Sequence, residues 1–204
     1  MIKAIFLDFE GVLTKNSLFI HTDVYDLVKD KISLNKLNKR YSKARLLNKS
    51  FKEFEKGFPS NWMEKAIKKI KFHSGTKEFL NWAKEKHRLY VASNNIPILC
   101  EKEMDYLSVR KYFAQIFISC YMKKRKPHKN FFREILKKSK EKLPAIFVDD
   151  AKRNLIVAKE IGFITVWVDN TKNNRLNDRR NRSKYKPDYT ITNLKELIQI
   201  VKKN

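Results

Sequence analysis

The sequence predicts an α/β protein with a doubly wound, mainly parallel sheet and a small all-helical segment inserted after the first strand. Two observations predict this architecture. From Gly75 onward, short apolar runs alternate with segments of helical periodicity, which is typical of strand–helix units joined by right-handed crossovers. Residues 15–72 instead contain helical periodicity and no convincing buried strand. We therefore divide the chain into an α/β core, residues 1–14 and 73–204, and a helical insert, residues 15–72.

The first predicted strand is Ala4–Leu7, a continuous apolar run typical of a strand buried on both faces of a parallel sheet. It is followed by Asp8 and Glu10, two carboxylates separated by one residue, and then by Gly11. Glycine permits a sharp turn and the close approach of a ligand to the backbone. Because ligands of open α/β sheets bind beyond the carboxyl ends of the strands, we expect Asp8 and Glu10 to lie at the functional site.

Four helices are predicted in the insert, each from a residue that commonly begins a helix. These residues are Thr22, Ser33, Ser50 and Ser60. In the helix after Ser33, five residues share one apolar face: Leu34, Leu37, Tyr41, Ala44 and Leu47. Residues 50–53 form a capping box, Gly57 with Pro59 ends that short helix, and the last helix is expected to continue to about Ile70.

The core continues with four more buried runs, predicted as strands at residues 89–92, 115–118, 145–148 and 164–168. Helical segments separate them, and one is expected to contain Pro127 in its first turn. Residues 170–187 are rich in Asn, Lys and Arg without apolar periodicity, so we expect a flexible basic loop within the core. A short strand ending at Ile191 and an amphipathic helix over residues 193–203 complete the prediction.

Length and composition fit one medium-sized domain with an insert, or two small domains. Of 204 residues 42% are hydrophobic, with 14 Phe, 8 Tyr and 3 Trp, which is enough for a core. The two cysteines, Cys100 and Cys120, form neither a metal-binding spacing nor a disulfide framework. The N-terminal apolar run is too short for a signal segment, and no run approaches the roughly 18 apolar residues of a membrane span. We expect a cytoplasmic protein with no membrane partner, either a monomer or a homodimer.

The formal net charge of +24 is the most unusual global property. A polyanionic partner such as nucleic acid is one explanation. Compositional drift is the other, and it is favoured because Lys outnumbers Arg and is spread evenly, whereas specific phosphate recognition tends to use Arg. The basic loop is the exception, with four arginines close together: Arg175, Arg179, Arg180 and Arg182. Nucleic acid is therefore not the favoured partner.

Four polar clusters follow or lie near the ends of the predicted strands: Asp8 with Glu10, Ser93 with Asn94, Lys126, and Asp149 with Asp150. Phosphoryl transfer needs such a set. A carboxylate can attack phosphorus, and a second acid can protonate the leaving oxygen and then activate water. Carboxylates from two strands suit Mg²⁺, while a hydroxyl and an ammonium can orient the phosphoryl oxygens.

The order of these clusters resembles the four motifs of the haloacid-dehalogenase-like (HAD) hydrolase superfamily. The matching segments are Asp8–Thr14, Val91–Asn94, Lys126-Pro127, and Phe147–Asp150 followed by Asn154. The resemblance covers the whole chain, and the helical insert is similar to the C1 cap that closes over the active site in that superfamily. A closing cap implies a small substrate, because it would obstruct a polymer.

The resemblance also implies roles for individual residues. Asp8 would be the nucleophile and a Mg²⁺ ligand, Glu10 the general acid/base that also offers its backbone carbonyl to the metal, and Asp150 the remaining side-chain ligand. Phosphoryl binding falls to three residues, Ser93, Asn94 and Lys126. Asp149, at a position that often carries Gly, would have a supporting role only.

Glu10 departs from the common pattern, which has Asp there. The additional methylene can move the carboxyl group by about 1.5 Å, and positioning errors of about 1 Å can cost 100-fold in rate. Some phosphatase branches of the superfamily carry Glu at this position. The dehalogenase branch lacks a carboxylate there, and the branch that cleaves phosphonates has Ala, so the resemblance favours a phosphatase.

The sequence thus predicts a Mg²⁺-dependent phosphatase that hydrolyses a small phosphomonoester through an aspartyl-phosphate intermediate. Two alternatives stay open. One is a phosphatase of nucleic-acid ends or phosphoproteins that uses the basic surface. The other is a non-catalytic interaction protein with this fold, and the intact set of polar residues weighs against it: Asp8, Ser93, Lys126 and Asp150.

Overall fold

A computed structural model describes residues 2–15, 23–45, 51–170 and 184–204 of the protein. Six parallel strands form one sheet in the order β3-β2-β1-β4-β5-β6. The strands are β1 (Ala4–Leu7), β2 (Arg88–Ser93), β3 (Gln115–Ile118), β4 (Ile146–Asp149), β5 (Ile164–Val168) and β6 (Tyr189–Ile191). The doubly wound parallel sheet predicted from the sequence is confirmed.

The strand order reverses between β1 and β4. The chain runs outward from β1 through β2 to β3 and then returns to the other side of β1 to build β4, β5 and β6. In doubly wound sheets the crevice at such a reversal is where ligands bind. Leu7 of β1 pairs with Val148 of β4 and with Val91 of β2. The residues that follow these positions are therefore brought to the same edge of the sheet.

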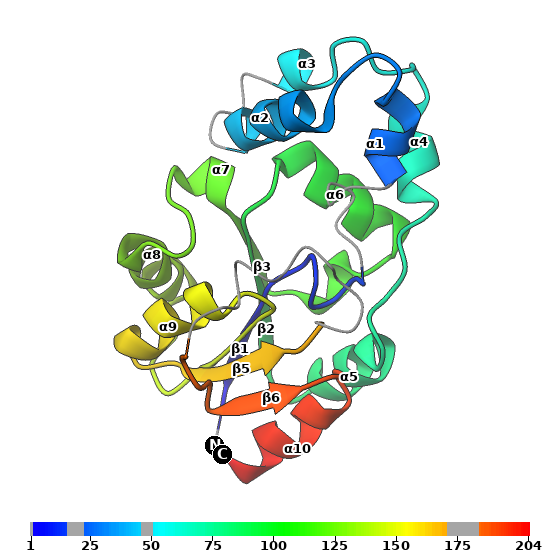
Figure 1. The fold of residues 1–204 in the computed structure, drawn as a ribbon. Coiled ribbons are helices and arrows are strands. Elements are labelled where there is room, and N and C mark those ends of the chain that lie inside the picture. Colours follow the sequence, from blue (N-terminus) through cyan, green and yellow to red (C-terminus); the bar gives the residue numbers. More distant parts are fainter. Residues whose placement is uncertain (1, 16–22, 46–50, 171–183) are drawn as a thin grey trace.

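Helices cover both faces of the sheet (Figure 1). On one face, Ile5 and Leu7 pack in a cluster with residues of α5 (Thr76–Ala83), α6 (Pro97–Tyr106) and α10 (Glu196–Lys203). On the other face, Phe6 packs with residues of α8 (Lys129–Ser139) and α9 (Lys152–Ile161). Alternate residues of β1 thus enter opposite layers, as expected for a strand buried on both sides.

The insert between β1 and β2 is helical, as the sequence predicts. It contains α1 (Asp23–Val28), α2 (Leu34–Ala44), α3 (Phe51–Phe54) and α4 (Trp62–Ile67), which gather at one end of the molecule in Figure 1. An aromatic cluster holds this cap together, because the ring of Phe54 lies 5.1 Å from that of Phe58 and 5.9 Å from that of Trp62. Ile96 and Leu99, at the start of α6, join the same apolar cluster and connect the cap to the core.

Two helix boundaries differ from the sequence prediction. α4 begins at Trp62 after Asn61, not at Ser60, and ends at Ile67. The chain then tightens into i→i+3 hydrogen bonds, one from the Ile70 N–H to the Ile67 carbonyl at 3.0 Å, which carries Ile70 out of the helix. Pro127 lies in a turn before α8, where the His128 N–H donates to the Arg125 carbonyl at 3.0 Å.

Some predictions fall outside the described residues. These are the helix starts at Thr22 and Ser50, the place of Leu47, and residues 171–183 of the predicted basic loop with their four arginines. Within the described part of the chain, no helix has the length and apolar character needed to cross a membrane. Two short connecting elements, α7 (Ser119–Met122) and the 3-10 helix Arg110–Tyr112, lie on either side of β3.

Candidate active site

Asp8 is the first residue after β1 and lies at the reversal point of the sheet. Its backbone N–H donates to the Val148 carbonyl at 2.9 Å, so the ladder between β1 and β4 fixes where its side chain begins. One carboxylate oxygen accepts from the Phe9 N–H at 2.8 Å, and the other lies 2.8 Å from the ammonium of Lys126. Burial raises the pKa of Asp8 to about 6, against the opposing effect of Lys126.

Lys126 connects the two central strands of the site. Its side chain is fully buried, and its Nζ lies 2.8 Å from Asp8 Oδ2 and 2.7 Å from Asp149 Oδ2. Burial alone would lower the pKa of Lys126, but the charges of Asp149 and Asp8 outweigh it and hold the pKa above its ordinary value. Lys126 therefore carries a positive charge at the centre of the site, already compensated by two carboxylates.

Asp149, the last residue of β4, is saturated by protein donors. Besides Lys126, its carboxylate accepts from the Ala151 N–H at 2.8 Å and from Asn154 Nδ2 at 2.9 and 3.0 Å. A carboxylate with this many donors is held in one orientation. Asp149 thus positions the Lys126 ammonium beside Asp8. This contact is consistent with the supporting role predicted for Asp149.

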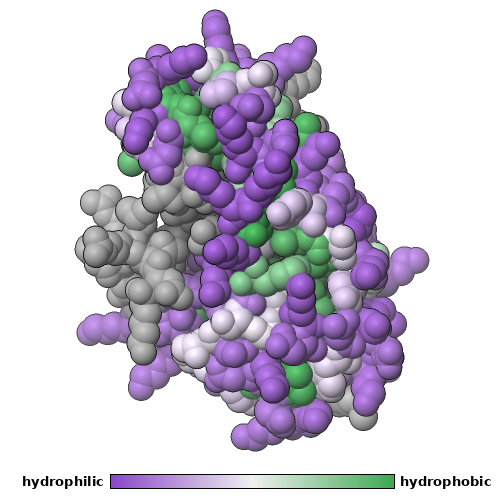
Figure 2. All heavy atoms as spheres, turned by 90° about the vertical axis from the view of Figure 1, so that its right-hand side faces the viewer, coloured by the Kyte–Doolittle hydropathy of each residue, from purple (hydrophilic) through white to green (hydrophobic). Residues whose placement is uncertain are grey.

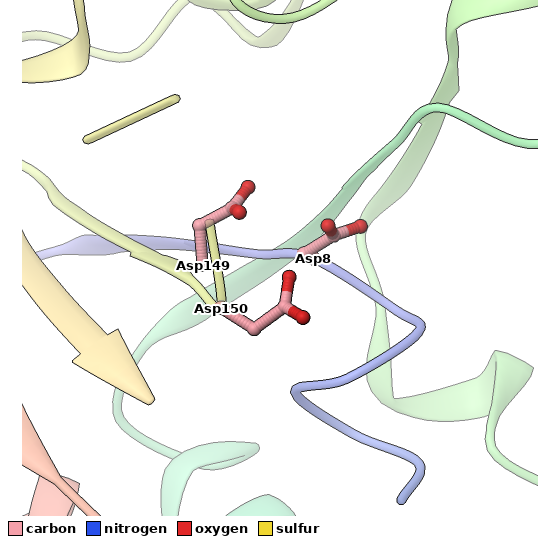
Figure 3. A group of neighbouring side chains, drawn as sticks. All are labelled: Asp8, Asp149 and Asp150. Atoms are coloured by element: carbon pink, nitrogen blue, oxygen red, sulfur yellow. The ribbon is translucent and has the colours of Figure 1, made fainter. Parts of the chain in front are cut away.

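Asp150 comes next in the chain and turns its carboxylate toward the loop after β1. Gly11 adopts a φ of +81°, and a Cβ at this position would lie 2.6 Å from Asp150 Oδ2. The close approach predicted for Gly11 is therefore that of the Asp150 carboxylate. Figure 3 shows Asp8, Asp149 and Asp150 together at the ends of β1 and β4, and one oxygen of each lies within 4.8 Å of the others.

This acidic cluster fits a divalent cation. Three carboxylates lie together here, and carboxylate oxygens are the donors that Mg²⁺ prefers. Asn154 Oδ1 is buried beside the cluster with no hydrogen-bond partner among the described residues, so it offers a further oxygen. Because the donors above already occupy Asp149, Asp8 and Asp150 are the side chains that would hold the ion.

Glu10 lies farther along the same loop and faces the cap. Its Oε1 accepts from Asn95 Nδ2 at 3.2 Å, and Asn95 Oδ1 in turn accepts from the Ile96 N–H at 2.7 Å and from the Tyr41 hydroxyl at 3.4 Å. Asn95 therefore orients the Glu10 carboxyl and connects it to α2 of the cap. The sequence did not single out Asn95, because its function depends on contacts between segments far apart in the chain.

Ser93 and Asn94 end β2 next to Asp8, and both line the cavity at the site. The Asn94 side chain is engaged by the backbone of Lys126: its Nδ2 donates to the Lys126 carbonyl at 2.8 Å and its Oδ1 accepts from the Lys126 N–H at 3.0 Å. This pair fixes the segment that carries the Lys126 side chain. Phosphoryl binding by Asn94 stays a prediction, and any such contact would add to this positioning role.

The predicted site residues border a cavity of about 100 Å³ between core and cap. Asp8, Glu10, Ser93, Lys126 and Asp150 all line it. The side chains around it that sequence reasoning missed include Lys15, Tyr41, Arg45, Arg153 and, as a site residue, Asn154. Tyr41 was assigned only to an apolar helix face. Burial and, after it, the charge of Glu10 raise the pKa of its hydroxyl well above the ordinary value, so it serves as a neutral donor.

The fold is shared with solved structures of low sequence identity. A HAD phosphatase from Thermococcus onnurineus is 21% identical over 98% of each chain, with a TM-score of 0.72. The 2-haloacid dehalogenase from Pseudomonas syringae pv. Tomato DC3000 is 16% identical over 100% of this chain and 99% of that chain, with a TM-score of 0.71. The magnesium-bound HAD-hydrolase YfnB from Bacillus subtilis is 15% identical over 98% of each chain, with a TM-score of 0.69. No curated protein matches the sequence.

At these sequence identities, the solved structures establish the fold of the chain and not its function. The family itself rests on a match of the sequence. Residues 11–168, which include the cap and most of the core, match the haloacid dehalogenase-like hydrolase family. The resemblance found in the four motifs is thereby confirmed, and the chain belongs to the haloacid dehalogenase-like hydrolases.

Proposed function

We propose that the protein is a Mg²⁺-dependent phosphatase that hydrolyses a small phosphomonoester through an aspartyl-phosphate on Asp8. The observation that carries this proposal is one cavity lined both by the acidic pair Asp8 and Asp150, on two central strands, and by a second acid, Glu10. Phosphoryl transfer uses each of these groups. It needs a nucleophile, a site for a cation and a proton donor for the leaving oxygen.

In the proposed reaction, an Asp8 oxygen forms a bond to phosphorus while the bond from phosphorus to the leaving oxygen breaks. Glu10 gives its proton to that oxygen and so releases an alcohol. Glu10, now a carboxylate, removes a proton from water, and the hydroxide oxygen bonds to phosphorus as the bond to Asp8 breaks. A bound Mg²⁺ supplies charge neutralisation at the phosphoryl oxygens. Lys126, positioned by Asp149 and Asn94, adds positive charge beside Asp8.

Dehalogenation would use fewer of the residues in this cavity. Displacement of a halide from carbon needs a carboxylate nucleophile, but the halide leaves as an anion without protonation. Glu10 would then have no proton to deliver, and the carboxylates of Asp149 and Asp150 would disfavour the departing anion near Asp8. A phosphomonoester gives a function to Glu10 and, together with a cation, to Asp150. The phosphatase is therefore the better-supported hydrolase.

The test is hydrolysis of 4-nitrophenyl phosphate with Mg²⁺, with EDTA, and by the Asp8→Asn variant. We expect turnover that needs Mg²⁺ and falls at least 10³-fold in Asp8→Asn, because covalent catalysis is lost. Asp105→Asn is the matched control, since Asp105 is an exposed partner of Arg110 outside the cavity. Release of chloride from 2-chloropropionate without release of phosphate from a panel of phosphomonoesters would overturn the proposal in favour of a dehalogenase.

A further inference from the structure

A second cavity of about 180 Å³ adjoins the first and is basic in character. The two cavities share four of their lining residues: Arg45, Asn94, Lys126 and Arg153. Arg125 and Ser119 line the second cavity in addition, and its described lining includes no carboxylate. Asp8, Glu10 and Asp150 line the first cavity alone, Arg125 lines the second alone, and Arg45 and Arg153 line both.

The charge of the second cavity is that of the arginines. The Lys126 ammonium is held between Asp8 and Asp149, at 2.8 and 2.7 Å, so its charge is already compensated. Arg125 and Arg153 are exposed, and Arg45 is half-buried. Guanidinium groups bind phosphate and carboxylate through paired hydrogen bonds and are always charged. Three of them around one cavity form a strong anion site.

The arginines come from both parts of the molecule. Arg45 follows α2 in the cap, where its guanidinium lies 4.9 Å from the centre of the Tyr41 ring. Arg125 immediately precedes Lys126, and Arg153 lies in the first turn of α9, four residues after Asp149. An anion between them would be bound by cap and core together, at the same time as the reacting group sits at Asp8.

We infer that the substrate is a phosphomonoester with a second anionic group, a phosphate or a carboxylate, and that Arg45, Arg125 and Arg153 bind that group. The inference rests on the proposed phosphatase function and defines the substrate class of the same site. The reacting phosphoryl group lies in the first cavity with its cation, and the second anion lies in the second cavity. A phosphomonoester without a second anionic group would not engage these three arginines.

Three substrates of equal chain length separate the options: propyl phosphate, 3-phosphonooxypropionate and propane-1,3-diol bisphosphate. We expect kcat/KM to be at least tenfold higher for one or both compounds with a second anionic group than for propyl phosphate, because charge-assisted hydrogen bonds contribute about this factor each. The preference between the carboxylate and the bisphosphate identifies the second anion. Equal kcat/KM for all three compounds would overturn the inference and leave the phosphatase standing.

Variants then assign the effect to the residues. The preference for the compound with a second anionic group should fall roughly tenfold in each of three variants, Arg45→Gln, Arg125→Gln and Arg153→Gln. It should fall by less in Arg153→Lys. Arg133→Gln is the control, because Arg133 is an exposed residue of α8 outside both cavities and loses the same charge. A preference that falls equally in Arg133→Gln would show a general charge effect and contradict a built site.

Binding provides a readout that does not need turnover. Isothermal titration of Asp8→Asn in Mg²⁺ uses propyl phosphate, 3-phosphonooxypropionate and the bisphosphate. One or both of the last two should bind more tightly than propyl phosphate, and Arg125→Gln in that background should remove the difference. If turnover fails for every phosphomonoester but this difference persists, the phosphatase proposal fails and the second-anion site stands. If binding shows no difference, the second-anion site is wrong whether or not turnover occurs.

Discussion

Asp8, Lys126 and Asp149 show how single residues divide the work of the site. Lys126 lies between the two carboxylates, and Asp149 accepts three further hydrogen bonds from Ala151 and Asn154. Asp149 is thus fixed by its surroundings, whereas Asp8 keeps a side chain that is 13% exposed toward the cavity. Two acids of the same type therefore differ in function because one is saturated with donors and the other faces the ligand.

Gly11 allows a prediction with a control in the same chain. Gly11 and Gly57 have positive φ values, +81° and +86°, so alanine at either position is strained by about 1–2 kcal/mol. Only at Gly11 would the new Cβ meet a neighbour, Asp150 Oδ2 at 2.6 Å, whereas nothing lies within 4 Å at Gly57. Urea unfolding should show destabilisation of both variants, with the larger effect in Gly11→Ala, because there the Asp150 carboxylate must also move.

Activity should separate the two variants. Gly11→Ala displaces the Asp150 carboxylate, and a shift of about 1 Å at a catalytic group can cost 100-fold, so we expect at least a tenfold loss of Mg²⁺-dependent turnover and weaker Mg²⁺ activation. Gly57→Ala should retain both. A Gly11→Ala enzyme with the metal dependence of Gly57→Ala would show that Asp150 does not contribute to the metal site.

At the scale of elements, a buried hydrogen-bond group ties β2 to the segment before β4. The Glu141 side chain is 4% exposed and accepts from both Arg88, with Nη2 at 2.8 Å, and the Tyr90 hydroxyl at 2.5 Å. Hydrogen bonds from Arg88 hold the pKa of Glu141 below its ordinary 4.5, although burial alone would raise it. The ionised carboxylate therefore stabilises the pairing of these segments.

This group predicts a pH dependence of stability. Because the folded-state pKa of Glu141 lies below the unfolded value, its contribution is complete above about pH 4.5 and is lost as pH falls through the folded value. Since Arg88 is largely exposed, we expect Glu141→Gln to cost only about 1 kcal/mol at pH 7. The difference in unfolding free energy between Glu141→Gln and wild type should shrink toward zero below pH 4.5.

Glu53→Gln serves as the comparison, because Glu53 pairs with Lys43 at 2.9 Å but both side chains are exposed. Its effect should be smaller and should vanish at high salt, since exposed ion pairs are screened. A gap between Glu141→Gln and wild type that stays constant from pH 7 to pH 3 would contradict a lowered pKa and point to packing alone.

The elements also show what a sequence can predict. The runs at residues 115–118 and 164–168 match β3 and β5 residue for residue, because parallel strands leave mainly apolar runs, here with one polar residue each, Gln115 and Thr165. Helix ends are less predictable: Ser60 and Asn61 are both good caps, and the tertiary path from cap to core decides between them. Tyr41 and Asn95 illustrate the same limit at the site, since they meet across 54 positions.

At the scale of the whole molecule, the net charge of +24 raises the question of a nucleic-acid partner. Hydrophilic side chains cover most of the face shown in Figure 2, as expected for a chain in which 33% of residues are charged. The catalytic groups, however, lie in a cavity of about 100 Å³ that Tyr41 and Arg45 of the cap border on one side. Most of the 46 lysines and arginines are therefore not among the described residues that line the cavities at the site.

The charge therefore predicts binding without catalysis. A 20-base-pair duplex with 5′-phosphates should bind at 20 mM salt and lose nearly all affinity by 200 mM, because lysine–phosphate contacts release counterions. At 200 mM salt, the duplex should neither inhibit turnover of 4-nitrophenyl phosphate nor lose its terminal phosphates. Single-stranded DNA of the same length is the control, because its end is less bulky than the end of a duplex. Release of terminal phosphate with a kcat/KM above that of the small substrates with a second anionic group would contradict a small-molecule phosphatase. A polymer end would then have to reach Asp8 beneath the cap.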